Sequence, residues 1–179
     1  MNDRLTKPAW IRQGLRTLAN DGPSGLKVGP MSARLQVSRG SFYWHFRDIA
    51  DFRSQLLQSW REISTEQVIE DLAARQGESG RLKRLMRRAL NGGRRLDRAV
   101  RSWAAQDEEV AAVVVAVDAR RIAGIAKLLF DAGVECERAT HRATFLYWAY
   151  LGQAAGMDPR HAVISTSALD EISDRLERA

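Results

Sequence analysis

The sequence predicts an all-α protein of about nine helices. Apolar residues recur every three or four positions along nearly the whole chain, and no segment alternates polar and apolar residues as a half-buried strand does. The breaks between these patterns hold Gly, Pro, Asn or Asp, which commonly end helices. With 179 residues, 45% apolar and 28% charged, the chain has a globular composition and can bury a core without a metal or a disulfide.

The helices can be placed in order along the chain. We expect the first to be capped by Thr6, to hold Pro8 in its opening turn and to end at Asp21-Gly22-Pro23. Two short helices are expected between about Pro30 and Phe46, and a long helix from the N-cap Asp48 to about Ala74. Five more helices are expected over residues 81–91, 96–105, 107–132, 136–156 and 159–178.

Residues 31–46 carry the most specific pattern. Met31 and Leu35 lie four residues apart on one face of a short helix, and Phe42 and Phe46 do so on the next. Ser38 can cap this second helix. With both phenylalanines facing inward, the outward face near the helix start holds Arg39, Gly40, Ser41 and Tyr43. Two short helices crossed about a tight turn, with cationic and hydroxyl groups at the start of the second, predict a helix-turn-helix that binds DNA.

This segment resembles the DNA-binding signature of the TetR family of transcriptional regulators, roughly I-A-x-x-x-G-V-S-x-G-T-x-Y-x-H-F. The residues that match outright are Val37, Ser38, Gly40, Tyr43, His45 and Phe46, and those that match by type are Met31, Ser32 and Ser41. Gln36 stands where the family usually has a glycine, and a left-handed backbone there would cost about 1 kcal/mol. We therefore expect a DNA-binding domain over residues 1–50 and a helical ligand-binding and dimerisation domain over residues 51–179.

Eight residues are assigned to DNA contact: Lys27, Ser38, Arg39, Gly40, Ser41, Tyr43, His45 and Arg47. Arg39 is expected to be the main base contact, because a guanidinium can bind guanine O6 and N7 together. Gly40 would let the helix backbone approach the groove closely. Lys27 and Arg47 can contact phosphates, which positions the domain without selecting a sequence.

Hydroxyl and aromatic groups complete the expected DNA-binding surface. Ser41 and Tyr43 can donate hydrogen bonds to phosphate oxygens, and the family resemblance gives Tyr43 the same task. For His45, a phosphate contact and a structural hydrogen bond at the helix end both stay open. Trp44 is expected to pack against the protein rather than to contact bases.

The charge favours a polyanionic partner, either nucleic acid or an anionic membrane surface. The chain holds 28 Lys and Arg against 22 Asp and Glu, a net charge of +6. Nine basic and four acidic residues fall in residues 1–60, whereas nine basic and twelve acidic residues fall in residues 101–179. We therefore expect a partner with phosphates to contact the first half. Together with the helix-turn-helix and the family resemblance, this charge leads us to expect double-stranded DNA with a palindromic site as the partner, and no membrane. A further basic run over residues 81–98 is expected to form the solvent-facing side of a helix.

Other classes of protein are disfavoured. A single cysteine, Cys136, leaves no intramolecular disulfide and fits a reducing cytoplasm, which is the expected location. We expect no membrane span and no secretory leader, because no apolar stretch is long enough and the N-terminus lacks an apolar run. Common catalytic motifs and a zinc-ligand quartet are missing from the sequence, so we expect neither an enzyme nor a metal or other cofactor.

Two C-terminal stripes predict a homodimer. On the last helix the stripe is Ser165, Leu169, Ile172 and Leu176, and on the helix before it the stripe includes Ala143, Tyr150, Leu151 and Ala154. Two such helices from each chain would form a four-helix interface, as the family resemblance also implies. The alternative is that both stripes face the chain's own core.

The middle of the chain is apolar enough to enclose a small apolar or amphipathic effector. Candidate lining residues are Met86, Leu90, Trp103, Val114, Asp118, Arg121, Tyr147 and Trp148. Asp118 lies among valines and needs a partner, and Arg121 can reach it from three residues further on. For these two residues, a structural ion pair and a ligand contact both stay open.

The leading hypothesis is a homodimeric, sequence-specific transcriptional regulator, more often a repressor in the TetR family, that a small effector releases from DNA. The long helix from Asp48 would couple effector binding to the separation of two recognition helices. The alternative is a DNA-bound architectural or cell-division factor with the same helix-turn-helix and no effector.

Overall fold

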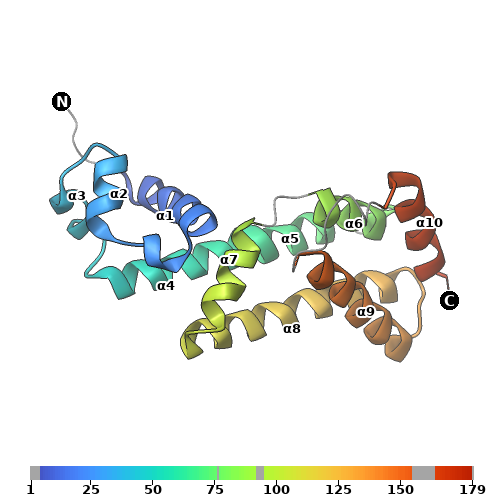
Figure 1. Cartoon of the computed structure of the whole chain (residues 1–179). Coiled ribbons are helices and arrows are strands. Elements are labelled where there is room, and N and C mark those ends of the chain that lie inside the picture. The colour runs from blue at the N-terminus through green and yellow to red at the C-terminus, as the bar shows by residue number, and fades with distance from the viewer. Residues whose placement is uncertain (1–4, 76, 92–94, 155–163, 179) are drawn as a thin grey trace. The chain divides into compact units, whose positions relative to one another are not determined.

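The computed structural model describes residues 5–75, 77–91, 95–154 and 164–178, and the side chains of all of these except Leu90, Asn91 and Ala154. The described residues form helices and turns and no strand, which confirms the all-α prediction (Figure 1). The α-helices are α1 (Lys7–Asp21), α2 (Val28–Arg34), α3 (Arg39–Tyr43), α4 (Ile49–Arg61), α5 (Gln67–Ala73), α6 (Arg81–Asn91), α7 (Arg95–Ala104), α8 (Glu108–Asp131), α9 (Cys136–Ala154) and α10 (Thr166–Leu176). A π-helical turn, Glu62–Glu66, joins α4 to α5, and together these three elements form the single long helix that the sequence predicts. With α4 and α5 counted as one helix, the described residues form nine helices, as the sequence predicts.

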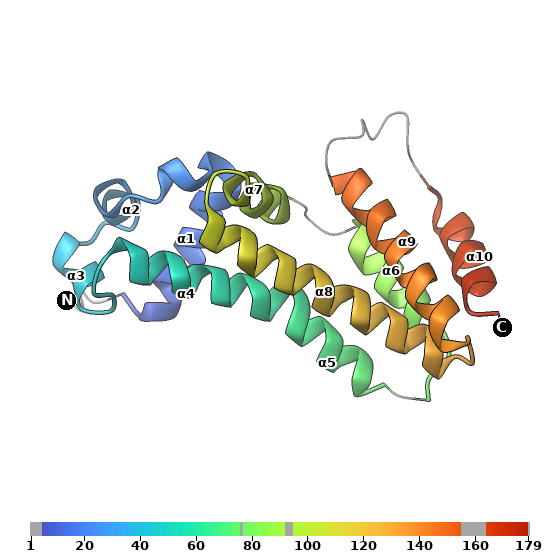
Figure 2. The ribbon, with the colours of Figure 1, turned by 90° about the horizontal axis from the view of Figure 1, so that it is seen from below.

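Contacts divide the chain into two compact units. Unit 1 consists of residues 1–64 and 94–115, and unit 2 consists of residues 65–93 and 116–179. Unit 1 therefore combines α1–α4 with α7 and the beginning of α8. Unit 2 combines α5, α6, the remainder of α8, α9 and α10, which Figure 2 shows from a second direction.

Aromatic side chains form the core around the helix-turn-helix in unit 1. Trp10 of α1, Phe42 of α3, Phe46 in the turn after α3, and Phe52 of α4 are each at most 1% exposed. The centroids of their contacting rings lie 4.9–5.3 Å apart. Three of the four contacts are edge-to-face, an arrangement that aromatic pairs favour. This cluster ties α1, α3 and α4 together.

Hydrogen-bonded tryptophans fix α7, which packs on α1 (Figure 1). The indole N–H of Trp60 donates to Asp97 Oδ1 at 3.2 Å, and Asp97 is only 6% exposed. The indole N–H of Trp103 donates to Asp107 Oδ2 at 3.0 Å, and Asp107 Oδ1 accepts from the backbone N–H of Val110 to cap α8. Leaving the buried Asp97, or either buried indole N–H, without its partner would cost about 1–3 kcal/mol.

The core of unit 2 lies among α6, α8, α9 and α10. Its buried residues are Leu82, Met86, Leu129, Val134, Ala139, Ala143 and Leu169. Ion pairs join α6 to its neighbours: Arg81 to Asp131 at 3.2 Å, Lys83 to Asp174 at 3.1 Å, and Arg87 to Asp170. Arg81 is 8% exposed, so the prediction that the basic run faces solvent is wrong for this residue. Arg84, Arg87 and Arg88 are exposed, as the sequence predicts. The basic run of α6 therefore both faces solvent and joins this helix to α8 and α10.

The predicted N-caps of three helices can be compared with the structure. Asp48 caps α4 as predicted, with Oδ1 accepting from the N–H of Asp51 at 2.8 Å. Thr6 and Ser38 are N-cap residues, but neither side chain accepts a capping hydrogen bond, so that prediction is wrong. Instead, their carbonyl oxygens accept from N–H groups three residues later.

The predicted helix over residues 159–178 also begins too early. Ile164 and Ser165 are not helical, and α10 starts at Thr166 because Ser165 Oγ accepts the N–H of Ala168 at 3.1 Å. Residues 159–163 lie outside the described ranges.

Replacement of Gly14 by alanine is expected to destabilise the fold. A Cβ at Gly14 would lie 2.5 Å from Phe52 Cζ and closer still to Leu56 Cδ1, both in fully buried side chains. Overpacking of this kind typically costs about 1–3 kcal/mol, which urea unfolding of Gly14→Ala would measure. The matched control is Gly152→Ala in α9, where a Cβ would meet nothing within 4 Å and stability should be unchanged or slightly higher. Equal stability of the two variants would contradict the close approach of α1 and α4.

Asp131 is expected to make unit 2 sensitive to acid. The hydrogen bond from Lys127 and then that from Arg81 hold the pKa of Asp131 below its ordinary value of 3.8, against the opposing effect of burial. Because the pKa of Asp131 is lower in the folded state than in the unfolded state, its ionised carboxylate stabilises the fold. This stabilisation is complete above the unfolded-state pKa, and it is lost as the pH falls through the folded-state pKa. Asp131→Asn should therefore lower the unfolding free energy at pH 7 by about 1–2 kcal/mol and reduce the loss between pH 5 and pH 3. If Asp131→Asn loses as much stability as the wild type between pH 5 and pH 3, this assignment is wrong. The control is Glu137→Gln at an exposed position of α9, which should lose stability over that interval as the wild type does.

Candidate nucleic-acid interface

Helices α2 and α3 and the turn between them form the helix-turn-helix that the sequence predicts. Gln36 in the turn has a φ of 54°, in the left-handed region, at the position where the TetR signature has glycine. The N–H groups of Gln36 and Val37 donate to the carbonyl oxygens of Ala33 and Ser32, both at 3.1 Å. These hydrogen bonds offset the cost of the left-handed residue, which is about 1 kcal/mol.

The inner face of α3 is held by the aromatic core. Phe42 and Phe46 are 0% and 1% exposed, so the prediction that both face inward is confirmed. Ser41 is also buried, at 6% exposed, and its Oγ accepts a hydrogen bond from the indole of Trp10 at 3.4 Å. The assignment of Ser41 to the outward face is therefore wrong. Its position next to Phe42 puts it toward α1, where it helps to hold α3.

Arg39 lies at the first position of α3 and is exposed. Its guanidinium lies over Gly29 of α2, since a Cβ at Gly29 would be 3.1 Å from Arg39 Nη2. Glycine at this position thus leaves room for the long side chain between the two helices. Gly40 follows on the exposed side, where a Cβ would have only Ser38 Oγ within contact range, at 3.6 Å. The start of α3 therefore presents a cation and an open stretch of backbone together.

Tyr43 and Trp44 are two exposed aromatic residues at the C-terminal end of α3. Tyr43 is 58% exposed, as expected for an outward residue. Trp44 is 65% exposed, so the prediction that it packs against the protein is wrong. The sequence offers little to distinguish a packed from an exposed tryptophan here, because Phe42 and Phe46 already fill the inward positions of this turn. Tyr43 and Trp44 extend the exposed surface beyond Arg39.

The remaining assigned residues differ in their exposure. Lys27, the N-cap residue of α2, is exposed, as are Ser38 and Arg47. His45 makes the structural hydrogen bond that the sequence analysis considered, since its Nε2 lies 2.6 Å from the carbonyl oxygen of Leu5. A hydrogen bond from Gln55, and then one from the backbone N–H of Arg47, lower the pKa of Asp51, so that its ionised carboxylate anchors the turn before α4.

The residues proposed to line one ligand cavity belong to different units. Trp103 and Val114 are buried in unit 1, whereas Met86 and Tyr147 are buried in unit 2. Trp148 is 65% exposed, so its assignment to a cavity is wrong. The side chain of Leu90 lies outside the described part of the chain.

Asp118 and Arg121 are joined through a tyrosine in unit 2. The hydroxyl of Tyr147 donates to Asp118 Oδ1 at 2.6 Å and accepts from Arg121 Nη1 at 3.4 Å. Arg121 Nε donates to Thr65 Oγ1 at 2.9 Å, and its guanidinium lies 6.0 Å from the ring centroid of Tyr150. The π-helical turn contributes Thr65, which is 1% exposed. Asp118 and Arg121 are half-buried, and the rings of Tyr147 and Tyr150 are stacked. Together with Thr65, these residues form a cluster that we call the polar group of unit 2.

The predicted dimerisation stripes face the core of unit 2 at three positions. Ala143 and Leu169 are 0% and 4% exposed within the core, and Leu176 packs against it. For these three, the alternative in which the stripe faces the chain's own core is correct, and their assignment to an interface is wrong. Ser165 caps α10, Tyr150 and Leu151 are half-buried, and the side chain of Ala154 is not among those described.

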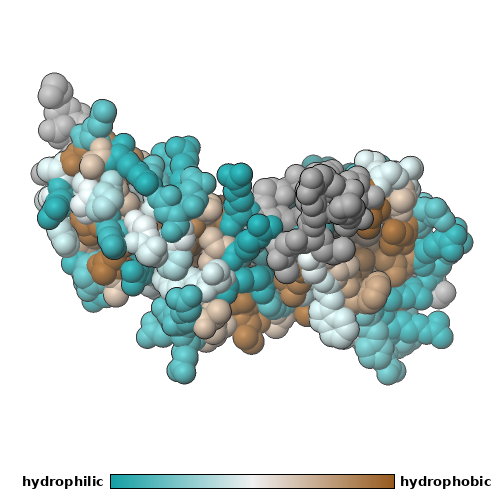
Figure 3. All heavy atoms as spheres, in the orientation of Figure 1, coloured by the Kyte–Doolittle hydropathy of each residue, from teal (hydrophilic) through white to brown (hydrophobic). Residues whose placement is uncertain are grey.

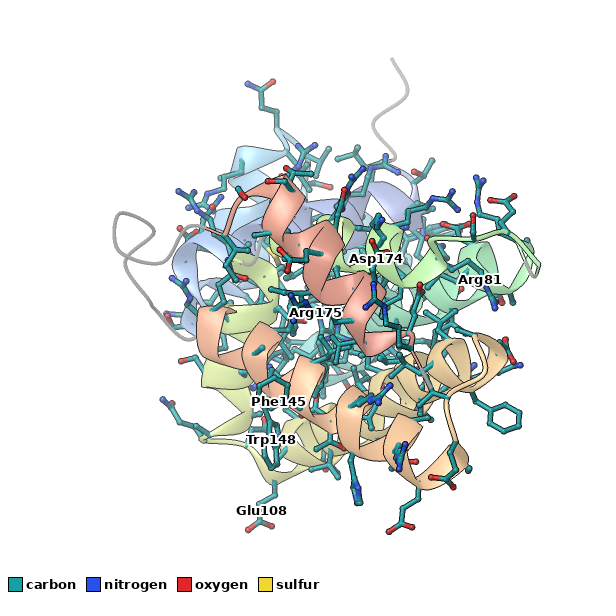
Figure 4. All side chains as sticks on the ribbon, turned by 90° about the vertical axis from the view of Figure 1, so that its right-hand side faces the viewer. Arg81, Glu108, Phe145, Trp148, Asp174 and Arg175 are labelled. Atoms are coloured by element: carbon teal, nitrogen blue, oxygen red, sulfur yellow. The ribbon has the colours of Figure 1, made fainter. Side chains whose placement is uncertain are left out.

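The exposed apolar residues of α9 lie on its other face. Phe145 and Trp148 are three positions apart and each is 65% exposed, and Figure 4 shows them side by side on the outside of α9. In the predicted stripe of α10, Ile172 is the apolar residue that is exposed, at 38%. Both faces of α9 are apolar, so the sequence alone could not indicate which of them is buried.

Comparison of the chain with models of known protein families, with curated proteins and with solved structures finds no match in any of the three. Every helix among the residues that the structure describes is too short or too polar to cross a membrane. In the same residues, no group of three or more His, Cys, Asp or Glu side chains is placed to hold a metal ion. On the face shown in Figure 3, hydrophilic and hydrophobic side chains are interspersed over the helix-turn-helix region.

Proposed function

We propose that the protein is a sequence-specific DNA-binding transcriptional regulator of the TetR type. The observation that carries this proposal is the two-sided character of α3: Phe42 is fully buried, while Arg39 and Tyr43 are exposed on the opposite side. A short helix anchored in this way can enter a major groove, where its N-terminal residues meet base edges. The resemblance of residues 31–46 to the TetR signature supports the same function.

The exposed residues divide into two kinds of contact. Arg39 would bind guanine O6 and N7, and Gly40 would let the backbone of α3 come close to the groove. Tyr43, Lys27 and Arg47 would contact phosphates, which sets the register but carries no sequence information. Ser41 and His45 would act indirectly, by holding α3 and the turn after it.

We propose that two copies bind one palindromic site. One recognition helix covers a single half-site, and a dimer places two such helices about 34–36 Å apart, one helical turn of DNA. The exposed pair Phe145 and Trp148 on α9 supports a contact between copies, because large exposed apolar side chains that adjoin each other are typical of interfaces.

The proposed effector is a small amphipathic molecule that binds unit 2 at Asp118, Arg121 and Tyr147. A ligand that takes over hydrogen bonds of the Tyr147 hydroxyl would alter how α8 and α9 are joined. Such a ligand can release DNA only through different affinities for the DNA-bound and free states. Repression relieved in this way fits a cytoplasmic protein.

Arg39→Ala is expected to weaken specific DNA binding. Duplexes selected from a random pool by the wild-type protein would be labelled, and binding would be followed by fluorescence anisotropy at several salt concentrations. Loss of one bidentate guanine contact should lower affinity for the selected duplex by about 10- to 100-fold, and affinity for a scrambled duplex much less. Lys27→Ala should weaken binding to both duplexes and reduce the salt slope by about 1.

The control for this experiment is Arg138→Ala, which removes the same charge from an exposed position of α9 in unit 2. It should bind the selected duplex as the wild type does. If Arg39→Ala and Tyr43→Ala together leave affinity for that duplex unchanged, the assignment of α3 as the recognition helix is wrong.

Replacement of Phe145 and Trp148 by serine is expected to convert a dimer to a monomer. Loss of two buried aromatic side chains at an interface typically costs several kcal/mol, so the dissociation constant should rise by about 100-fold or more. Sedimentation velocity over a range of protein concentrations would measure the change. The control is Phe130→Ser in α8, where an equally large side chain is 58% exposed. A wild-type protein that stays monomeric, or a double variant that stays dimeric, contradicts this interface.

A further inference from the structure

Gly29 is the second residue of α2, and the conformation of its own backbone does not require glycine. Its φ is not positive, so other residues could adopt the same conformation. Glycine also favours a helix less than alanine does, because it loses more backbone entropy on folding. The missing side chain therefore matters for the group that lies against Gly29 rather than for α2 itself.

That group is the guanidinium of Arg39, at the start of α3, which packs on α2 (Figure 1). A Cβ at Gly29 would lie 3.1 Å from Arg39 Nη2 and 3.6 Å from both Cζ and Nε, and these three atoms would be the nearest to it. Non-bonded atoms normally pack at about 3.5–4.0 Å. A side chain in place of Gly29 would therefore displace the guanidinium.

The contact with Gly29 leaves the hydrogen-bond donors of Arg39 unused. No hydrogen bond or ion pair joins the Arg39 guanidinium to another residue that the structure describes. Arg34 of α2 differs, because its guanidinium donates to Asp21 and to Thr17 of α1. Arg39 is thus positioned by packing alone, with its N–H groups available to bind guanine O6 and N7.

We propose that Gly29 is a positioning residue for base recognition, because it lets the Arg39 guanidinium pack against α2 in one preferred direction. The inference rests on the proposed function, in which Arg39 binds guanine. A side chain that is already positioned loses less rotational freedom when it binds. A bidentate contact also needs the planar guanidinium to be aligned with the base edge. Displacement of Arg39 should therefore weaken the preference for guanine without removing a donor.

The test compares Gly29→Val with the wild type by fluorescence anisotropy, on the selected duplex and on duplexes with one base pair changed at a time. The guanine that Arg39 contacts is the position at which Arg39→Ala no longer discriminates. Gly29→Val should bind the selected duplex about 2- to 10-fold more weakly and lose preference for that guanine by the same factor. In an Arg39→Ala background it should have no further effect, because the side chain that it displaces is gone.

Two further variants serve as controls for folding. Gly152→Val makes the same change in α9 of unit 2, where a Cβ would meet nothing within 4 Å, and it should bind DNA as the wild type does. Gly29→Ala adds only the Cβ, should be at least as stable as the wild type in urea, and should lose less affinity than Gly29→Val.

A measurement without DNA tests the contact itself. In ¹H–¹⁵N spectra, the Nε–H signal of Arg39 is identified by its absence in Arg39→Lys. This signal should shift in Gly29→Ala and Gly29→Val, whereas that of Arg12, an exposed residue of α1, should not.

Three results would overturn the inference. These are an unchanged Arg39 signal, wild-type discrimination by Gly29→Val, or an equal loss of affinity from Gly29→Val with and without Arg39. Failure of the proposed function would look different, because Arg39→Ala would then itself leave binding of the selected duplex unchanged.

Discussion

The aromatic cluster of Trp10, Phe42, Phe46 and Phe52 is the constraint on which the helix-turn-helix depends. α3 has only five residues and cannot be stable as an isolated helix, so its orientation must come from what it packs against. Phe42 contacts all three other rings of the cluster, and Trp10 also donates a hydrogen bond to Ser41. Burial of this side determines which residues of α3 remain exposed, and therefore which surface the helix presents to solvent.

Unit 2 is held in a different way, by an apolar centre with charged pairs around it. Arg81, Lys83 and Arg87 of α6 pair with carboxylates of α8 and α10 beside the core residues Leu82 and Met86. Arg81 and Asp131 are the most buried of these partners, with side chains 10% and 14% exposed, so their pairing is screened least by solvent. Arg81, Lys83 and Arg87 thus join α6 to α8 and α10 inside unit 2.

Polar residues within unit 2 show that contacts between helices can add partners that spacing along one helix does not predict. Asp118 and Arg121 are three residues apart on α8, and the Tyr147 hydroxyl of α9 bonds to both of them, while Thr65 accepts a hydrogen bond from Arg121. Thr65 reaches Arg121 from the π-helical turn between α4 and α5. Such a turn has no distinct signal in a single sequence, because it inserts one residue into an otherwise regular helical pattern.

The sequence by itself determined the helical class, the order of the helices, the cap at Asp48, and the inward positions of Phe42 and Phe46, because periodicity and capping are properties of neighbouring residues. The resemblance to the TetR signature, which has glycine at this position, also indicated the left-handed turn residue Gln36. Only the tertiary structure decided that Ser41 is buried under Trp10, that Trp44 is exposed, and that α9 buries Ala143 and exposes Phe145. Each of these depends on which of two acceptable faces another helix covers, and that choice is made by contacts between residues far apart in the chain.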